Sequence, residues 1–303
     1  MVLVGLTIGF SNAQANFASV ASAIPVYIII TLFLLLSGTC IGYIYARLSK
    51  INLLTALLAT VPGGVGVMAA IAADYNRNVT LVALVQVIRV TSVVFLIPLV
   101  ARASVGTDTS PQVILSNKAL INLDPSYLSL LGLTLLIAAF AVKLAVRFKI
   151  PATHFFSALL VGISFNYALN LLPFVNITFT PPPLTNLIGQ ILLGITIGEY
   201  WGEKPTLGKR TLLYAIISTI MTLGAGAGAS LIAMQLTNWD WLTCLLVTAP
   251  GGSAEMILVA LALNHNVDIV TGGHLVRLIA INCSLPIWVY LFRRIDGQIE
   301  ETA

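Results

Sequence analysis

Residues 53–100 and residues 241–288 are two copies of one stretch of sequence. When Pro62-Gly63-Gly64 is aligned with Pro250-Gly251-Gly252, the offset is 188 positions and the two stretches share sixteen identities without a gap. The identities include Arg89 and Arg277, which both lie inside apolar runs. A duplicated apolar chain with a glycine break and a charged residue in each copy has the pattern of a membrane transporter.

The composition requires a lipid environment. Of the 303 residues, 58% are hydrophobic and only 9% are charged, whereas about 25% of the residues in a soluble domain are charged. The mean hydropathy is +0.98, and a water-soluble fold of this length could not bury so much apolar surface. The net charge of +4 comes from scattered basic residues. This pattern indicates membrane orientation, and we expect no nucleic-acid partner.

Two apolar segments, residues 53–73 and residues 241–263, are interrupted in the middle by Pro-Gly-Gly, which leaves nine to eleven residues on each side. As helices, such halves are ~14–17 Å long, about half of the ~30 Å hydrocarbon core. Asn52 and Asp240 precede the two segments at matching positions, and both residue types suit helix N-caps. Each segment is therefore either one broken spanning helix or a re-entrant hairpin.

The distribution of Lys and Arg distinguishes these two topologies. If both segments are hairpins, eleven basic residues lie on the cytoplasmic side and two lie outside. If both segments span, Arg47, Lys50, Arg293 and Arg294 change sides, and the count becomes seven against six. The positive-inside rule favours hairpins. The sequence therefore predicts an all-α polytopic membrane protein with an inverted internal repeat, about eight spanning helices and two re-entrant Pro-Gly-Gly hairpins. We expect it in the bacterial inner membrane with both termini in the cytoplasm.

The repeats set the expected domain boundaries. Residues 1–101 form the first membrane repeat, residues 102–125 a polar linker, residues 126–294 the second membrane repeat and residues 295–303 a cytoplasmic tail. The duplication extends upstream, because the segment from Gly5 to Gly9 is similar to the segment from Gly194 to Gly198. The first repeat has no counterpart for residues 126–147 and 151–173. We therefore expect it to be incomplete at its N-terminus by about two helices.

The two repeated arginines are the first candidates for a binding site. Arg89 and Arg277 lie about ten residues into spans that begin near Val79 and Val267, which places them ~15 Å deep, near the membrane midplane. An arginine there costs ~2.5–3.5 kcal/mol on insertion scales, so it must face protein, water or an anion. Its planar fork suits carboxylate, sulfate or phosphate. These arginines either bind an anionic solute or bond the free carbonyls of the nearby breaks, and the two roles are compatible.

The breaks themselves are the second candidates. The glycines let the chain turn back, and the helix after each break points its positive dipole end into the membrane centre. The alternative is a packed turn without a ligand. The copies differ here, because Glu255 of the second copy corresponds to Val67 of the first. Glu255 either takes a proton or cation during coupling, or forms a static ion pair with Arg277.

His274 aligns with Gln86, one turn before the arginines. It either faces the same cavity or is a hydrogen-bonded packing residue. Four asparagines flank the exits of the broken segments, and helix capping accounts for them: Asn76, Asn78, Asn264 and Asn266. We expect no catalytic residue and no metal ligand. The candidate substrate-binding residues are Arg89, Arg277, Gly63, Gly64, Gly251, Gly252, Ser253, Glu255 and His274.

The duplicated Pro-Gly-Gly-x-x-Glu-Met pattern, the segment from Gly194 to Gly198 and the repeated mid-span arginine resemble the AbrB-type family of bacterial membrane proteins. The resemblance covers essentially the whole chain, and it implies two copies of one domain, usually with further N-terminal helices. Val67 departs from the family pattern, which argues against a symmetric role for two glutamates. Two labels come with this family: ammonia monooxygenase and regulation of gene expression.

The residues favour a secondary transporter that moves a small polar or anionic solute by alternating access, with its site between the two breaks and the two arginines. The alternatives are a membrane protein with a regulatory role, a membrane enzyme and a channel. A copper or iron enzyme needs clustered ligands, but the three histidines are scattered. The expected partners are the solute, the lipid bilayer and a second copy of the chain in a homodimer. A proton or Na⁺ is the expected coupling ion, and we expect no cofactor.

Overall fold

The computed structural model describes residues 2–13, 17–105, 124–148, 153–171, 179–199, 209–263 and 265–302. Every regular element in these ranges is an α-helix, which confirms the all-α fold class. The predicted 102–125 linker lies mostly outside the described residues, since α6 continues to Val105 and α7 begins at Pro125. Lys118, Lys149, Lys204 and Asn264 also lie outside them.

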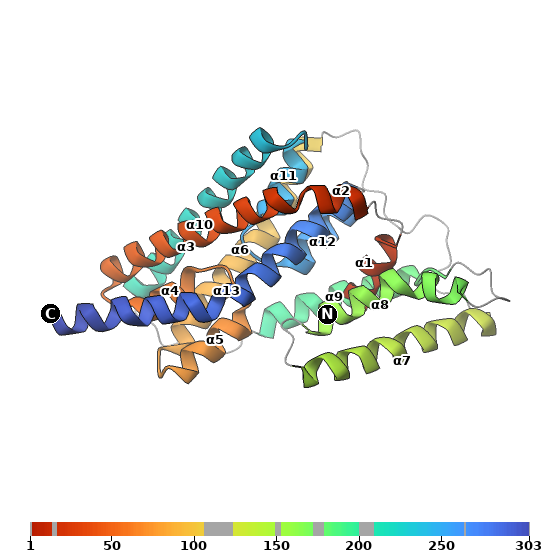
Figure 1. The fold of residues 1–303 in the computed structure, drawn as a ribbon, viewed down its shortest axis with the longest axis horizontal. Coiled ribbons are helices and arrows are strands. Elements are labelled where there is room, and N and C mark those ends of the chain that lie inside the picture. Colours follow the sequence, from red (N-terminus) through yellow and green to blue (C-terminus); the bar gives the residue numbers. More distant parts are fainter. Residues whose placement is uncertain are drawn as a thin grey trace. The chain divides into compact units, whose positions relative to one another are not determined.

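The helices fall into two compact units (Figure 1). Unit 1 contains four helices: α1 (Val2–Ser11), α7 (Pro125–Arg147), α8 (Thr153–Asn170) and α9 (Pro183–Glu199). Unit 2 contains most of the duplicated sequence: α2 (Phe17–Ser22), α3 (Ile24–Ser49), α4 (Leu53–Thr60), α5 (Val65–Asp74), α6 (Val79–Val105), α10 (Lys209–Leu236), α11 (Trp241–Thr248) and most of α13 (Val267–Thr302). The remaining helix, α12 (Ser253–Ala262), belongs to unit 2 through Met256 and to unit 1 after it.

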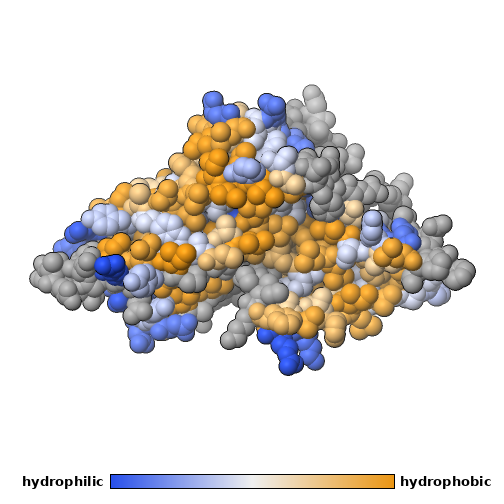
Figure 2. Space-filling model, in the orientation of Figure 1, coloured by the Kyte–Doolittle hydropathy of each residue, from blue (hydrophilic) through white to orange (hydrophobic). Residues whose placement is uncertain are grey.

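Four helices of the described chain are long and apolar enough to cross a membrane: Ile24–Ser49, Val79–Ala101, Pro125–Arg147 and Arg210–Leu236. The sequence-based count of about eight spanning helices goes beyond these four and stays a prediction. Large apolar side chains lie on the surface, as Figure 2 shows in orange. On α7, Leu136 is 70% exposed and Phe140 is 68% exposed. Side chains of this kind belong against lipid tails.

Small residues let two helices of unit 1 approach closely. A Cβ at Gly9 of α1 would lie 2.8 Å from Gly162 Cα and even closer to the Leu159 carbonyl, while a Cβ at Gly162 of α8 would lie 2.7 Å from the Leu6 carbonyl. Membrane helices use such glycines for backbone contact. Nearby, Phe10 and Phe165 pack edge to face around Phe179.

Unit 2 contains the same order of elements twice. The first copy is α3–α4–α5–α6 and the second is α10–α11–α12–α13. Helices α3 and α10 pack on each other, and each also packs on the short helix that follows it. A Cβ at Gly38 of α3 would lie 3.1 Å from Pro62 Cδ, and a Cβ at Gly226 of α10 would lie 2.8 Å from Pro250 Cδ. Each long helix therefore packs tightly, through a glycine, against the proline of its own break.

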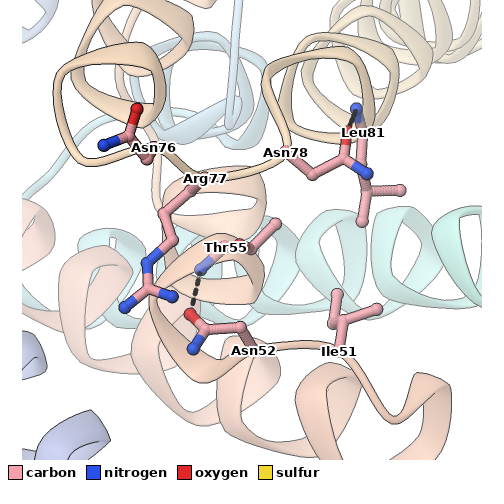
Figure 3. A pocket seen from close by; sticks show the side chains of 7 residues that line it. All are labelled: Ile51, Asn52, Thr55, Asn76, Arg77, Asn78 and Leu81. Atoms are coloured by element: carbon pink, nitrogen blue, oxygen red, sulfur yellow. Dashed lines mark hydrogen bonds between the residues drawn. The ribbon is translucent and has the colours of Figure 1, made fainter.

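The predicted N-caps are confirmed. Asn52 Oδ1 accepts from the Leu54 N–H at 3.0 Å and the Thr55 N–H at 3.3 Å. Asp240 Oδ2 accepts from the Leu242 N–H at 3.1 Å and the Thr243 N–H at 3.3 Å. These bonds satisfy donors that have no partner inside α4 and α11. Asn78 acts similarly, since its Oδ1 accepts from the Leu81 N–H at 2.9 Å (Figure 3). Asn76 and Asn266 instead adopt left-handed φ values of 51° and 38° in the connections.

Candidate functional site

The first break, residues 61–64 between α4 and α5, is held by two side chains of α6. Arg89 Nη1 donates to the Thr60 carbonyl at 3.1 Å and to the Val61 carbonyl at 3.4 Å. Gln86 Nε2 donates to the Leu58 carbonyl at 2.8 Å and to the Val61 carbonyl at 3.1 Å. Arg89 Nη2 donates to Gln86 Oε1 at 2.5 Å, which joins the two side chains. Because α4 ends at the break, these carbonyls have no helical partner.

The second break, residues 249–252 between α11 and α12, is held in the same way by α13. Arg277 Nη1 donates to the Ala249 carbonyl at 2.8 Å. Arg277 Nη2 lies 2.7 Å from His274 Nδ1, and His274 Nε2 lies 3.0 Å from the Leu246 carbonyl. A guanidinium only donates and a carbonyl only accepts. His274 is therefore the neutral tautomer with its proton on Nε2, and it replaces Gln86 as the bridge between an arginine and a carbonyl.

We call each set of two side chains and its carbonyls a clamp: Gln86 and Arg89 form the first clamp, and His274 and Arg277 form the second. All four side chains are buried. The structure thus gives both arginines the carbonyl-binding role that the sequence left open, and it shows His274 as a hydrogen-bonded packing residue. Gln86 was not among the predicted site residues, although its alignment with His274 at the repeat offset could have identified it.

Arg89 also lies against the other break. A Cβ at Gly251 would be 3.8 Å from Arg89 Nε, 3.8 Å from Val90 Cα and 3.7 Å from Val93 Cγ2. The Nε donor is buried and, within the described ranges, has no hydrogen-bond partner. A buried donor without a partner costs ~1–3 kcal/mol. Arg89 therefore holds the first break with Nη1 and Nη2, while its Nε, which has no partner in the described chain, lies close to the second.

The two breaks have different backbones despite their identical Pro-Gly-Gly sequence. Gly251 and Gly252 have φ values of 155° and 53°, whereas Gly64 has φ −56°. Gly64 is exposed, while a Cβ at Gly63 would collide with the Met68 side chain. Glycine is thus favoured at Gly252 by its left-handed conformation, and a larger residue at Gly63 would displace the Met68 side chain.

Glu255 turns back toward the second break. A Cβ at Gly252 would lie 2.7 Å from Glu255 Oε2, so the carboxylate covers the residue that precedes α12. An acid in the third helical position commonly reaches back to the N-cap in this way, and it is stabilised there by the helix dipole. The bonds of the Arg277 guanidinium run to the Ala249 carbonyl and to His274. The two roles predicted for Glu255, a coupling group or a static partner of Arg277, stay predictions.

The chain was then compared with known proteins. Residues 1–293 match the family described as "Transition state regulatory protein AbrB". The chain belongs to the AbrB family. This confirms the resemblance that the repeated motif indicated, over almost the full length of the chain.

Two known proteins match this chain over most of its length. YhjN of Bacillus subtilis (strain 168), whose name assigns no function, is 26% identical over 264 residues, which cover 85% of this chain and 68% of YhjN. The candidate regulator AbrB of Escherichia coli (strain K12) is 26% identical over 263 residues, which cover 86% of this chain and 72% of that protein. No solved structure matches the chain.

Comparison of the two clamps predicts which substitution is tolerated at His274. His274→Gln should keep an unfolding temperature close to that of the wild type, because glutamine already bridges arginine and carbonyl in the first clamp. His274→Leu should be destabilised by ~1–3 kcal/mol, because it leaves the Arg277 and Leu246 groups without this partner. Thermal unfolding of the detergent-purified variants measures both. Equal losses in the two variants would show that the imidazole ring itself is required.

Proposed function

We propose that this AbrB-family membrane protein is a secondary transporter of a small polar or anionic solute. It works by alternating access between two inverted copies, whose broken segments are re-entrant and meet near the membrane midplane. The protein lies in the bacterial inner membrane with both termini in the cytoplasm, an orientation supported by the excess of basic residues on one side. The solute binds beside the second break, next to Arg89 and the beginning of α12.

The observation that carries this proposal is the position of Arg89. Its Nη groups hold the break of its own copy, and its Nε donor, buried and without a partner in the described chain, lies close to Gly251 of the other copy. A guanidinium is always charged and donates along several directions. An oxyanion that reached Gly251 would supply the missing acceptor. The beginning of α12 lies next to Gly251 and adds the positive end of a helix dipole.

The duplication supports transport over static scaffolding. Secondary transporters commonly place discontinuous helices from two related halves around a midplane site. Here each half contributes one discontinuous segment and one arginine clamp. The halves share their order of elements but differ at the breaks, where Glu255 of the second copy corresponds to Val67 of the first. An unequal pair suits a site that binds one solute molecule between two moving halves.

The family description contains the word regulatory, and one relative's name contains the word regulator. A regulatory effect is compatible with this proposal, because moving a metabolite across the membrane changes its concentration in the cytoplasm. A redox enzyme that uses copper or iron would need a cluster of metal ligands. Among the described residues, no three His, Cys, Asp or Glu side chains lie close enough together to hold a metal ion. The transporter is therefore the function that the arrangement supports best.

A solute screen tests the proposed function. Purified protein is heated in the presence of small inorganic anions, amino acids and organic acids, and we expect at least one anionic class to raise the unfolding temperature. A ligand present at 100 times its Kd stabilises the folded state by ~2.7 kcal/mol. That solute should then cross proteoliposomes that contain the protein and not protein-free vesicles. Stabilisation without flux would indicate a sensor, and a tightly bound metal in the purified protein would indicate an enzyme.

The same flux assay tests Glu255 as the coupling group. In Glu255→Gln the side chain keeps its shape over Gly252 but can no longer take up a proton. If Glu255 couples transport, flux should lose its dependence on pH or on the cation gradient while the unfolding temperature changes little. Unchanged coupling in this variant would leave Glu255 with a capping role only.

A further inference from the structure

The buried charges around the two breaks do not cancel. Among the described residues, the buried side chains of the types Arg, Lys, His, Asp and Glu are Arg89, Glu255, His274 and Arg277, and all four belong to unit 2. His274 is the neutral tautomer, so two guanidiniums are accompanied by one carboxylate. A buried charge is costly unless an opposite charge accompanies it. The region therefore has an excess of one positive charge, which a bound monoanion would neutralise.

The Glu255 carboxylate lies where such an anion would be well stabilised. Helix α12 begins at Ser253, and the glycine before it has no side chain that could accept a bond from the first turn. A Cβ at Gly252 would lie 2.7 Å from Glu255 Oε2, so Glu255 brings a negative charge to the positive end of α12. Gly251, Gly252 and Ser253 are only half-buried, which leaves this end of the helix accessible to a small molecule.

The first copy shows that the fold does not need an acid at this place. Val67 corresponds to Glu255, and its Cγ2 lies 3.9 Å from a Cβ at Gly64. The residue three positions after the second glycine thus covers that glycine in both copies. Helix α5 begins after Gly64 without a side-chain cap and has the same ten residues as α12. A helix of this length therefore forms here without a carboxylate, and the charge of Glu255 is left for another role.

Arg89 provides a donor beside the same place. Its Nε is buried, has no partner in the described part of the chain, and lies 3.8 Å from a Cβ at Gly251, which directly precedes the glycine that Glu255 covers. The Nη groups of Arg277, in contrast, bond the Ala249 carbonyl and His274. A guanidinium pairs best with a planar carboxylate or a similar oxyanion. The unused donor and the positive end of α12 are thus neighbours, and both favour an anion.

We infer that the Glu255 carboxylate and a carboxylate group of the solute are alternative occupants of the beginning of α12. The inference rests on the proposed transport function and names the solute as a small monocarboxylate. The solute binds when Glu255 takes a proton from solution, becomes neutral and moves off Gly252. The region keeps its excess of one positive charge in both states, because the proton neutralises Glu255 as the monoanion enters. One proton and one monoanion therefore cross together, and no net charge moves.

The other ionisable groups around the second break leave Glu255 as the one that titrates. They are Arg89 of α6 and His274 and Arg277 of α13, while α10 contacts the break through Gly226. Both arginines stay charged. His274 is held neutral between the Arg277 guanidinium and the Leu246 carbonyl, since a second ring proton would meet a donor.

Formate, the smallest carboxylate, is the probe. The unfolding temperature of the purified full chain is measured in sodium formate and in sodium chloride at equal ionic strength, from about pH 5 to about pH 9, a range that covers many buried carboxyl groups. In the wild type, the affinity for formate should fall about tenfold per pH unit once Glu255 is ionised. In Glu255→Gln and Glu255→Ala, formate should stabilise equally over the whole range. Asp74→Asn removes an exposed acid and should behave as the wild type does.

The outcomes separate this inference from the proposed function. The same pH dependence in the wild type and both Glu255 variants overturns the inference, and so does a lack of response to formate in all of them, even where the solute screen finds flux. Solute uptake that follows an imposed membrane potential also contradicts it. If the variants respond as expected but no solute crosses proteoliposomes, the competition at α12 is supported and the transport proposal fails.

Discussion

Arg277→Ala is expected to abolish transport of the solute while the protein is still produced and inserted. The substitution removes the donors to the Ala249 carbonyl and to His274 Nδ1. It leaves a buried carbonyl without this partner, at a cost of ~1–3 kcal/mol, and it removes one of two deep positive charges from the neighbourhood of the breaks. Flux into proteoliposomes, measured beside the unfolding temperature of the same preparation, tests this expectation.

Arg294→Ala is the matched control, because Arg294 lies on the same helix, α13, and is exposed. Its flux should equal that of the wild type. If Arg277→Ala also transports normally, Arg277 has only a structural role and the proposed site must be rebuilt without it. If its solute-dependent stabilisation persists although flux is lost, the second clamp serves the movement of the chain and not the binding of the solute.

Gly9→Ala is expected to destabilise unit 1 strongly. The new Cβ would lie 2.8 Å from Gly162 Cα and still closer to the Leu159 carbonyl, so two backbones have to separate. Overpacking of this kind costs ~1–3 kcal/mol, occasionally more. The measurement is the unfolding temperature in detergent, together with the yield of monodisperse protein.

Gly132→Ala in α7 provides the control within the same unit, because nothing lies within 4 Å of a Cβ at that position. Replacing a helical glycine by alanine in open space should stabilise the helix by up to ~1 kcal/mol. Opposite effects of the two variants would show that backbone contact, and not helix propensity, explains Gly9. A Gly9→Ala protein as stable as the wild type would mean that α1 and α8 do not pack as closely as described.

Much of the local structure could be predicted from the sequence. The Pro-Gly-Gly breaks and the caps at Asn52 and Asp240 depend on neighbours within a few residues, so composition and spacing were sufficient to find them. The repeat offset also related the two arginines. It could not say which groups they contact, because the choice between a carbonyl and a solute depends on how α6 packs on α4 and how α13 packs on α11.

The conformations of the breaks were also beyond sequence analysis. Both read Pro-Gly-Gly, yet only Gly251 and Gly252 have positive φ among the described glycines. The difference follows from neighbours in space: Met68 fills the room beside Gly63, whereas Glu255 covers Gly252. The position of Glu255 depends on the same neighbours. Its charge suggested Arg277 as a partner, and the structure places its carboxylate over Gly252 at the beginning of its own helix.

The close approach of Gly251 to Arg89 links the break of the second copy to an arginine of the first. Arg89 anchors the first break through the Thr60 carbonyl, and its remaining donor lies under Gly251 of the second. A displacement of the second break therefore changes the surroundings of the residue that anchors the first. In the proposed transport cycle, this coupling would prevent the two breaks from moving independently, and so would oppose opening of the site to both sides of the membrane at once.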